Sequence, residues 1–216
     1  MPIDLTPSSD IAFSPTVKAI QTAKGSRSIY KNGQWATTIT PRLFDFLRPA
    51  RSLYVGTVSA DGQPYIQHRG GPPGFIRVLS ETRLAFADYS GNQQYISTGN
   101  LADNPKAHLF VMDYENTRRI KIWGNAQMIE GDADLLASVS DDMPEAWPER
   151  VFVFDVAVWS ANCPQHIPQR FEAVDVQAAL ADKDARISEL ETELAALRQK
   201  QWLFDGCRDD LSGSAP

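Results

Sequence analysis

The sequence contains little cysteine, and this limits the chemistry that it can support. Its two cysteines, Cys163 and Cys207, are too few for a disulfide framework. There is no Cys-x-x-Cys pair, and the three histidines are not spaced as metal ligands, so we predict no metal site. Cys163 has no adjacent base that would make it a thiolate, and we interpret it as a structural thiol.

Long apolar runs and common nucleotide motifs are also missing. No apolar run approaches the roughly 20 residues that span a bilayer, and the N-terminal residues do not resemble a secretory signal, so we expect a cytoplasmic protein. The absence of GxGxxG, P-loop and GxSxG motifs removes support for classical dinucleotide, nucleoside triphosphate and hydrolase sites. The net charge of -6 argues against a general nucleic-acid binder.

What is present indicates a globular domain with an appendage. The chain has 216 residues, of which 43% are hydrophobic and 22% charged. Residues 1–50 form a helical segment that we expect to pack on the main domain. Ser14 and Thr40 are predicted N-caps, each followed by a proline at the first helical position, and Gly25 is a predicted helix stop.

The region 51–173 is dominated by predicted strands. Asp61-Gly62 is a strong hairpin-turn signal between two of them. The strand segments read SLYVGTVSA, QPYIQHR, GFIRVL, RLAFAD, KAHLFVMDY, RRIKIWGNAQMIEG and RVFVFDVAVW. Short helices are predicted in GNQQYISTGNLADNP and GDADLLASVSDD. Strands this short and closely spaced indicate a mainly β fold, an antiparallel barrel or sandwich with peripheral helices.

Residues 174–204 are predicted to form one long helix, with a flexible tail at 205–216. Asp175 is the expected N-cap, and no glycine or proline interrupts the helix. Leucine and isoleucine recur at heptad spacing, at Leu180, Ile187, Leu190, Leu194 and Leu197. The helix therefore either packs on its own domain or self-associates as a short coiled coil.

Three polar runs follow predicted strands and are candidate binding segments. The first ends a strand with Gln67, His68, Arg69 and Gly70. A guanidinium suits phosphate oxygens, an amide and an imidazole suit a heterocycle, and glycine lets a ligand approach the backbone. The second and third runs contribute the candidates Asp88, Tyr89, Asn92, Gln93, Gln94, Ser97, Asn100, Gln165 and His166. Each run alone is also compatible with an ordinary polar loop.

Together these runs resemble the FMN-binding split barrel of the pyridoxamine 5'-phosphate oxidase-like superfamily, especially its poorly characterised bacterial branch. The resemblance rests on VGTVSADGQPYIQHRGGPPGFIRVL, LAFADYSGNQQYISTGNLADNPKAHLFVMDY, RRIKIWGNAQMIE and CPQHIPQRF. It implies a six-stranded antiparallel Greek-key barrel, and a homodimer that binds FMN at the subunit interface. It also implies that Arg119 and Lys121 lie near the flavin.

The sequence departs from true pyridoxamine phosphate oxidases at the expected phosphate site. Their arginine-lysine pair is replaced here by Asn92, Gln93 and Gln94, and the C-terminal Arg/His substrate motif by the leucine-bearing helix. Oxidation of pyridoxamine phosphate is therefore not expected. Phosphate binding would rest more on Arg69, backbone amides and Arg27.

The leading functional hypothesis is an FMN-dependent oxidoreductase, a reductase or oxidase of a small molecule, with NAD(P)H as a candidate electron donor. No catalytic residue is assigned. A haem-binding split barrel is the second hypothesis, with His68 or His166 as the axial ligand. The third is a non-enzymatic flavin-binding or interaction protein in which the terminal helix is the working part.

Overall fold

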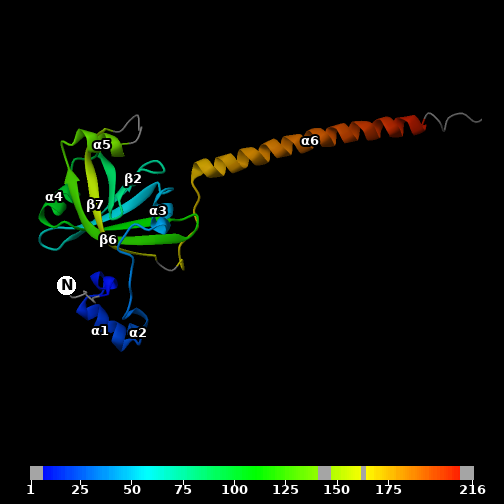
Figure 1. Cartoon of the computed structure of the whole chain (residues 1–216). Coiled ribbons are helices and arrows are strands. Elements are labelled where there is room, and N and C mark those ends of the chain that lie inside the picture. Colours follow the sequence, from blue (N-terminus) through cyan, green and yellow to red (C-terminus); the bar gives the residue numbers. More distant parts are fainter. Residues whose placement is uncertain (1–6, 141–146, 162–163, 210–216) are drawn as a thin grey trace, which may run out of the picture. The chain divides into compact units, whose positions relative to one another are not determined.

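A computed structural model describes residues 7–140, 147–161 and 164–209, with side chains through residue 200. Contacts divide the chain into two compact units, residues 1–169 and 170–216. Cys163 lies outside the described residues. The first unit is a mainly β split barrel with peripheral helices, and the second contains one long helix (Figure 1). In the described part of the chain, no helix has the length and apolarity required to cross a bilayer.

The barrel is one seven-stranded sheet in which every pairing is antiparallel. The order across the sheet is β2-β1-β5-β6-β7-β4-β3. The strands are β1 (Ser52–Val58), β2 (Pro64–Gly70), β3 (Arg77–Ser80), β4 (Arg83–Tyr89), β5 (Lys106–Asp113), β6 (Arg118–Ile129) and β7 (Pro148–Ala161). The count is seven rather than the expected six, because the short segment β3 pairs with β4 at one edge.

Local sequence signals explain where most helices begin and end. The helices are η1 (Ser8–Ile11), α1 (Pro15–Ala23), α2 (Arg27–Tyr30), α3 (Pro41–Leu47), α4 (Ile96–Asp103), α5 (Ala133–Val139) and α6 (Ala173–Asp209). Ser14 and Thr40 accept hydrogen bonds from the amides three residues later, as predicted for N-caps. Helix α6 begins at Ala173, two residues before the expected N-cap Asp175, because the Glu172 carbonyl already accepts the Val176 amide.

The barrel core is a continuous set of apolar side chains from the inner faces of the strands and from α3. Phe86 of β4 stacks on Phe152 of β7, with ring centroids 4.6 Å apart. Both faces of these two strands are buried, since α5 packs Val139 against their outer face. This double burial accounts for the nearly continuous apolar run from Val151 to Val158.

The long strands β6 and β7 bend together at a register shift between Trp123 and Gly124. A Cβ atom at Gly124 would lie 2.0 Å from the Asp155 carbonyl oxygen and 2.7 Å from the Phe154 ring. Only glycine allows this close approach of the two backbones. The bend lets the same strands pair with β5 on one side and β4 on the other.

Candidate functional site

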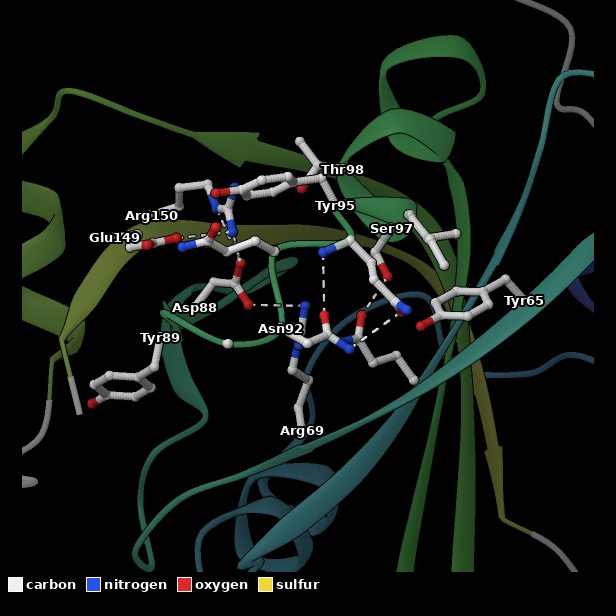
Figure 2. Close-up of a pocket in the computed structure, with 15 residues that line it drawn as sticks. Tyr65, Arg69, Asp88, Tyr89, Asn92, Tyr95, Ser97, Thr98, Glu149 and Arg150 are labelled. Carbon is white, nitrogen blue, oxygen red and sulfur yellow. Dashed lines mark hydrogen bonds and ion pairs between the residues drawn. The ribbon is translucent and has the colours of Figure 1, made fainter. Parts of the chain in front are cut away.

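One pocket gathers side chains from both of the first two polar runs (Figure 2). Its volume is about 190 Å³. We call it the Asp88 pocket; its walls are Tyr65, Gln67, Arg69, Asp88, Tyr89, Gly91, Asn92, Gln93, Gln94, Tyr95, Ile96, Ser97, Thr98, Glu149 and Arg150. The pocket therefore brings together the end of β4, the start of α4, one side of β2 and the start of β7.

Strand alternation decides which β2 residues enter the pocket. Tyr65, Gln67 and Arg69 are half-buried and line it, whereas Ile66 and His68 between them are exposed. The Gln67 side-chain oxygen accepts a 2.8 Å hydrogen bond from the Ser97 hydroxyl, which joins β2 to α4. The predicted run 67–70 is thus divided between two faces of the sheet.

Asp88 carries two guanidinium groups. Its carboxylate lies 2.8 Å from Arg69 Nη2 and 2.9 Å from Arg150 Nη2, and Arg150 Nε donates to it at 3.1 Å (Figure 2). Asp88 is 2% exposed and Arg150 is 9% exposed. Two cations on one buried anion leave this cluster with a net positive charge, which favours a further anion close to it.

Arg150 is also surrounded by groups that limit its movement. Its guanidinium lies 4.9 Å from the centre of the Tyr95 ring and 3.3 Å from the Glu149 carboxylate. Glu130, which is more exposed, lies 3.6 Å away. These carboxylates partly neutralise Arg150, so Arg69 is the cation with the greater capacity to bind a ligand.

Arg69 has that capacity in its Nε atom. Among the described residues, this atom is buried and has no hydrogen-bond partner. A buried donor without a partner costs about 1–3 kcal/mol, so an acceptor supplied by a ligand would recover that free energy. The donor lies in the wall of the Asp88 pocket, where Arg69 forms its ion pair with Asp88.

The loop before α4 supplies further donors. Gln93 and Tyr95 adopt left-handed conformations, with φ of 57° and 53°, which are uncommon for residues other than glycine. Tyr95 occupies the N-cap position of α4, and no side chain caps the helix there. The first amides of α4 therefore remain available to an anion. Asn92 orders the loop through hydrogen bonds with the Gln94 amide and side chain.

Asn100 lies below the pocket rather than in its wall. It is buried and donates a 3.0 Å hydrogen bond to the Thr57 hydroxyl of β1. This bond fixes α4 against the sheet, so Asn100 has a positioning role that the sequence pattern alone assigned to ligand binding.

A second group of predicted residues lies on the outer face of strands β2, β1, β5 and β6, which we call the aromatic face. It carries Tyr54, His68, His108, Phe110, Lys121 and Trp123. His68 contacts the Tyr54 ring, and the His108 ring lies 4.8 Å from that of Trp123. Burial, with a smaller effect from the nearby Lys121 charge, lowers the pKa of His108 to about 4. His108 is therefore neutral at pH 7.

Arg119 lies elsewhere, in a cavity of about 730 Å³ lined by Arg42, Asp45, Phe46, Arg118, Arg119, Ile120, Ala161 and Pro164. Its Nε atom is buried without a partner in the described part of the chain. Arg27 bonds Gln21 on the N-terminal helices. Gln165 and His166 are exposed in a turn, and neither lines a pocket described here.

Sequence reasoning missed Arg150, Glu149 and Tyr95. Arg150 is the direct cross-strand neighbour of Asp88 in the pairing of β4 with β7. The two residues are 62 positions apart, so only the strand pairing could have revealed the contact. Tyr95 stood inside a run that was already singled out, and its position just before α4 was the available signal.

Comparison with known families places this geometry in context. A family model described as pyridoxamine 5'-phosphate oxidase matches residues 39–177. The chain belongs to the pyridoxamine 5'-phosphate oxidase family. The match spans all seven strands and every wall residue of the Asp88 pocket, so family membership covers both the barrel and the candidate site. No curated protein matches the chain.

Solved structures of the family show low identity. The chain is 21% identical to Group A Streptococcus HupZ, with 62% of this chain and 99% of that chain covered and a TM-score of 0.45. It is 13% identical to an FMN-binding protein from Syntrophomonas wolfei, with 66% and 97% covered and a TM-score of 0.42. It is 17% identical to an F420 reductase, with 54% and 94% covered and a TM-score of 0.40. Likenesses at this level carry no argument about function.

Proposed function

We propose that the chain is a flavoprotein that binds FMN and acts as an oxidoreductase on a small molecule. The observation that carries this proposal is the buried, unpartnered Nε of Arg69 in the Asp88 pocket, beside the uncapped start of α4. Both features favour an anion, and family membership supports a flavin phosphate as that anion.

The residues of the pocket fit the phosphate and ribityl parts of such a cofactor. Arg69 would hold the phosphate as a fork of donors, with Asp88 and Arg150 fixing its orientation. Ser97 and Gln67 would offer neutral hydrogen bonds to sugar-like hydroxyls. When bound, FMN supplies hydride transfer, and the protein contributes binding, orientation and electrostatics.

The pocket is too small for the whole cofactor. Its volume of about 190 Å³ is below the roughly 300–1,000 Å³ of sites that enclose drug-sized ligands. A homodimer would provide the remaining surface, with Arg119 and Lys121 as candidates near the ring. The aromatic face supports self-association, because its rings are only half-buried and the neighbouring Ile66 is 69% exposed.

The proposal is tested by comparing FMN with riboflavin, which lacks the phosphate. We expect Arg69→Ala to weaken FMN binding by about 2 kcal/mol, the scale of a hydrogen bond to a charged group, and riboflavin binding much less. Arg83→Ala is a matched control, because Arg83 pairs with Asp155 outside the pocket. Equal losses for both ligands would show that Arg69 does not meet the phosphate.

Three further measurements test the remaining parts. Purified protein should show the two broad absorbance bands of flavin, whereas one intense Soret band would indicate haem. Oxidation of NADH or NADPH with an added acceptor should be flavin-dependent, and its absence with every acceptor tried would favour a binding protein. Light scattering should give the mass of a dimer, and a flavin-loaded monomer would refute the shared site.

A further inference from the structure

The long C-terminal helix presents a continuous apolar seam. Leu180, Ile187 and Leu194 are spaced by seven residues, with Leu190 and Leu197 between them. These five side chains are 46–62% exposed, and every residue from 170 to 200 is exposed. Helix α6 has 37 residues, so the seam lies along a continuous rod rather than a short terminal turn (Figure 1).

We propose that α6 forms a parallel, in-register, two-stranded coiled coil with α6 of a second copy of the chain. In heptad terms, Leu180, Ile187 and Leu194 occupy a positions, and Leu190 and Leu197 occupy d positions. This surface is separate from the barrel and does not require flavin.

The charges beside the seam select the partner and the orientation. In a parallel pair, each g residue faces the e residue that lies five positions later in the partner. Arg186 therefore faces Glu191 of the partner subunit, and Glu193 faces Arg198 of the partner subunit. Both pairs are of opposite charge, and the two-fold symmetry of the pair repeats each one.

The antiparallel arrangement lacks this complementarity. The alignment that packs Ile187 on Leu190 places Arg186 beside Glu193, which is attractive. The same alignment places Asp184 beside Glu191, which is repulsive. Attraction and repulsion cancel, so the charges favour the parallel pair.

Lys183 is the one charged residue at an a or d position between Leu180 and Leu197, and it weakens the seam. The parallel pair brings two copies of it together. We therefore expect moderate affinity, and we expect Lys183→Leu to strengthen the association. A helix that does not associate would respond to this substitution only through its intrinsic helix propensity.

Cysteine cross-linking in the full chain tests the arrangement. In a background where Cys163 and Cys207 are replaced by serine, Leu180→Cys places a thiol at an a position and Ala178→Cys places one at an outward f position. Under mild oxidation, we expect Leu180→Cys to form a disulfide dimer at least about tenfold faster than the control, because only seam residues face their own copies. Equal rates would overturn the proposal, as would no cross-linking at Leu180.

A charge exchange tests the pairing independently of flavin content. Arg186 already bonds Glu189 within its own helix at 2.7 Å, so Glu193 and Arg198 are the cleaner pair. Glu193→Arg removes a like-charge neighbour of Glu189, which favours the single helix, but creates repulsion across the coiled coil. We expect it to slow cross-linking at Leu180→Cys about tenfold, and Glu193→Arg with Arg198→Glu to restore the rate.

The double variant decides the outcome. If it cross-links no faster than Glu193→Arg alone, the parallel pairing is refuted. Flavin absorbance measured on the same samples reports separately on the proposed cofactor site, so failure of one proposal does not imply failure of the other.

Discussion

Asp88 and Arg150 lie directly opposite each other across β4 and β7, and the same carboxylate also binds Arg69 from β2. One buried anion thus connects three strands that are not all neighbours in the sheet. The two cations converge at the wall of a pocket where the first turn of α4 begins. The stability of the fold and the charge of the candidate site therefore depend on the same side chain.

Replacing this carboxylate should destabilise the protein. Asp88→Asn keeps the side-chain shape but leaves two largely buried guanidinium groups without their anion, and we expect a loss of about 3 kcal/mol in unfolding free energy. Urea denaturation measures the change. Asp155→Asn is the matched control, because its pair with Arg83 is exposed and should contribute less than about 1 kcal/mol. Similar losses in the two variants would contradict the structural role of Asp88.

Adding a cation to the pocket should increase its preference for phosphate. Gln94 is exposed and lines the Asp88 pocket, where the two cations are matched by Asp88 and Glu149. We expect Gln94→Lys to tighten FMN binding about tenfold, or about 1.4 kcal/mol, while riboflavin binding changes little. Gln63→Lys, on the exposed hairpin turn outside the pocket, controls for net charge. A comparable gain from Gln63→Lys would indicate a general rather than local effect.

His108 should make stability depend on pH. Its pKa is lowered from 6.5 to about 4, so the unfolded chain binds more protons at this site between those values. Its contribution to stability is complete above about pH 6.5 and is lost as the pH falls toward 4. The slope should be at most about 1.4 kcal/mol per pH unit, and less because the ring is partly exposed. His108→Asn should flatten this part of the urea-denaturation profile, and an unchanged slope would assign it to other groups.

Two glycines should respond to alanine in opposite directions. At Gly124 the added Cβ would meet the Asp155 carbonyl at 2.0 Å, and we expect a loss of about 3 kcal/mol or failure to fold. At Gly99, within α4, it would meet nothing within 4 Å, and we expect a gain of about 0.5–1 kcal/mol from helix propensity. Thermal unfolding measures both. A stable Gly124→Ala variant would show that the bend in β6 can relax.

Local features were predictable because their causes lie within a few residues. Ser14 and Thr40 cap helices as expected, and the Asp61-Gly62 turn connects β1 to β2 with Gly62 in a left-handed conformation. The candidate runs at 67–70 and 88–97 were correctly predicted to lie near each other, although the pattern did not separate Arg69 from His68. Whether these residues bind FMN remains a prediction.

The sequence by itself determined the strands, most helix boundaries, the family resemblance and the heptad seam of α6, since each depends on local propensity or periodicity. Tertiary structure decided the register that sets Arg150 against Asp88, the side of β2 that carries Arg69, and the burial that keeps His108 neutral. Those features depend on which distant strands become neighbours. That choice is made by packing of the whole barrel, which no short segment encodes.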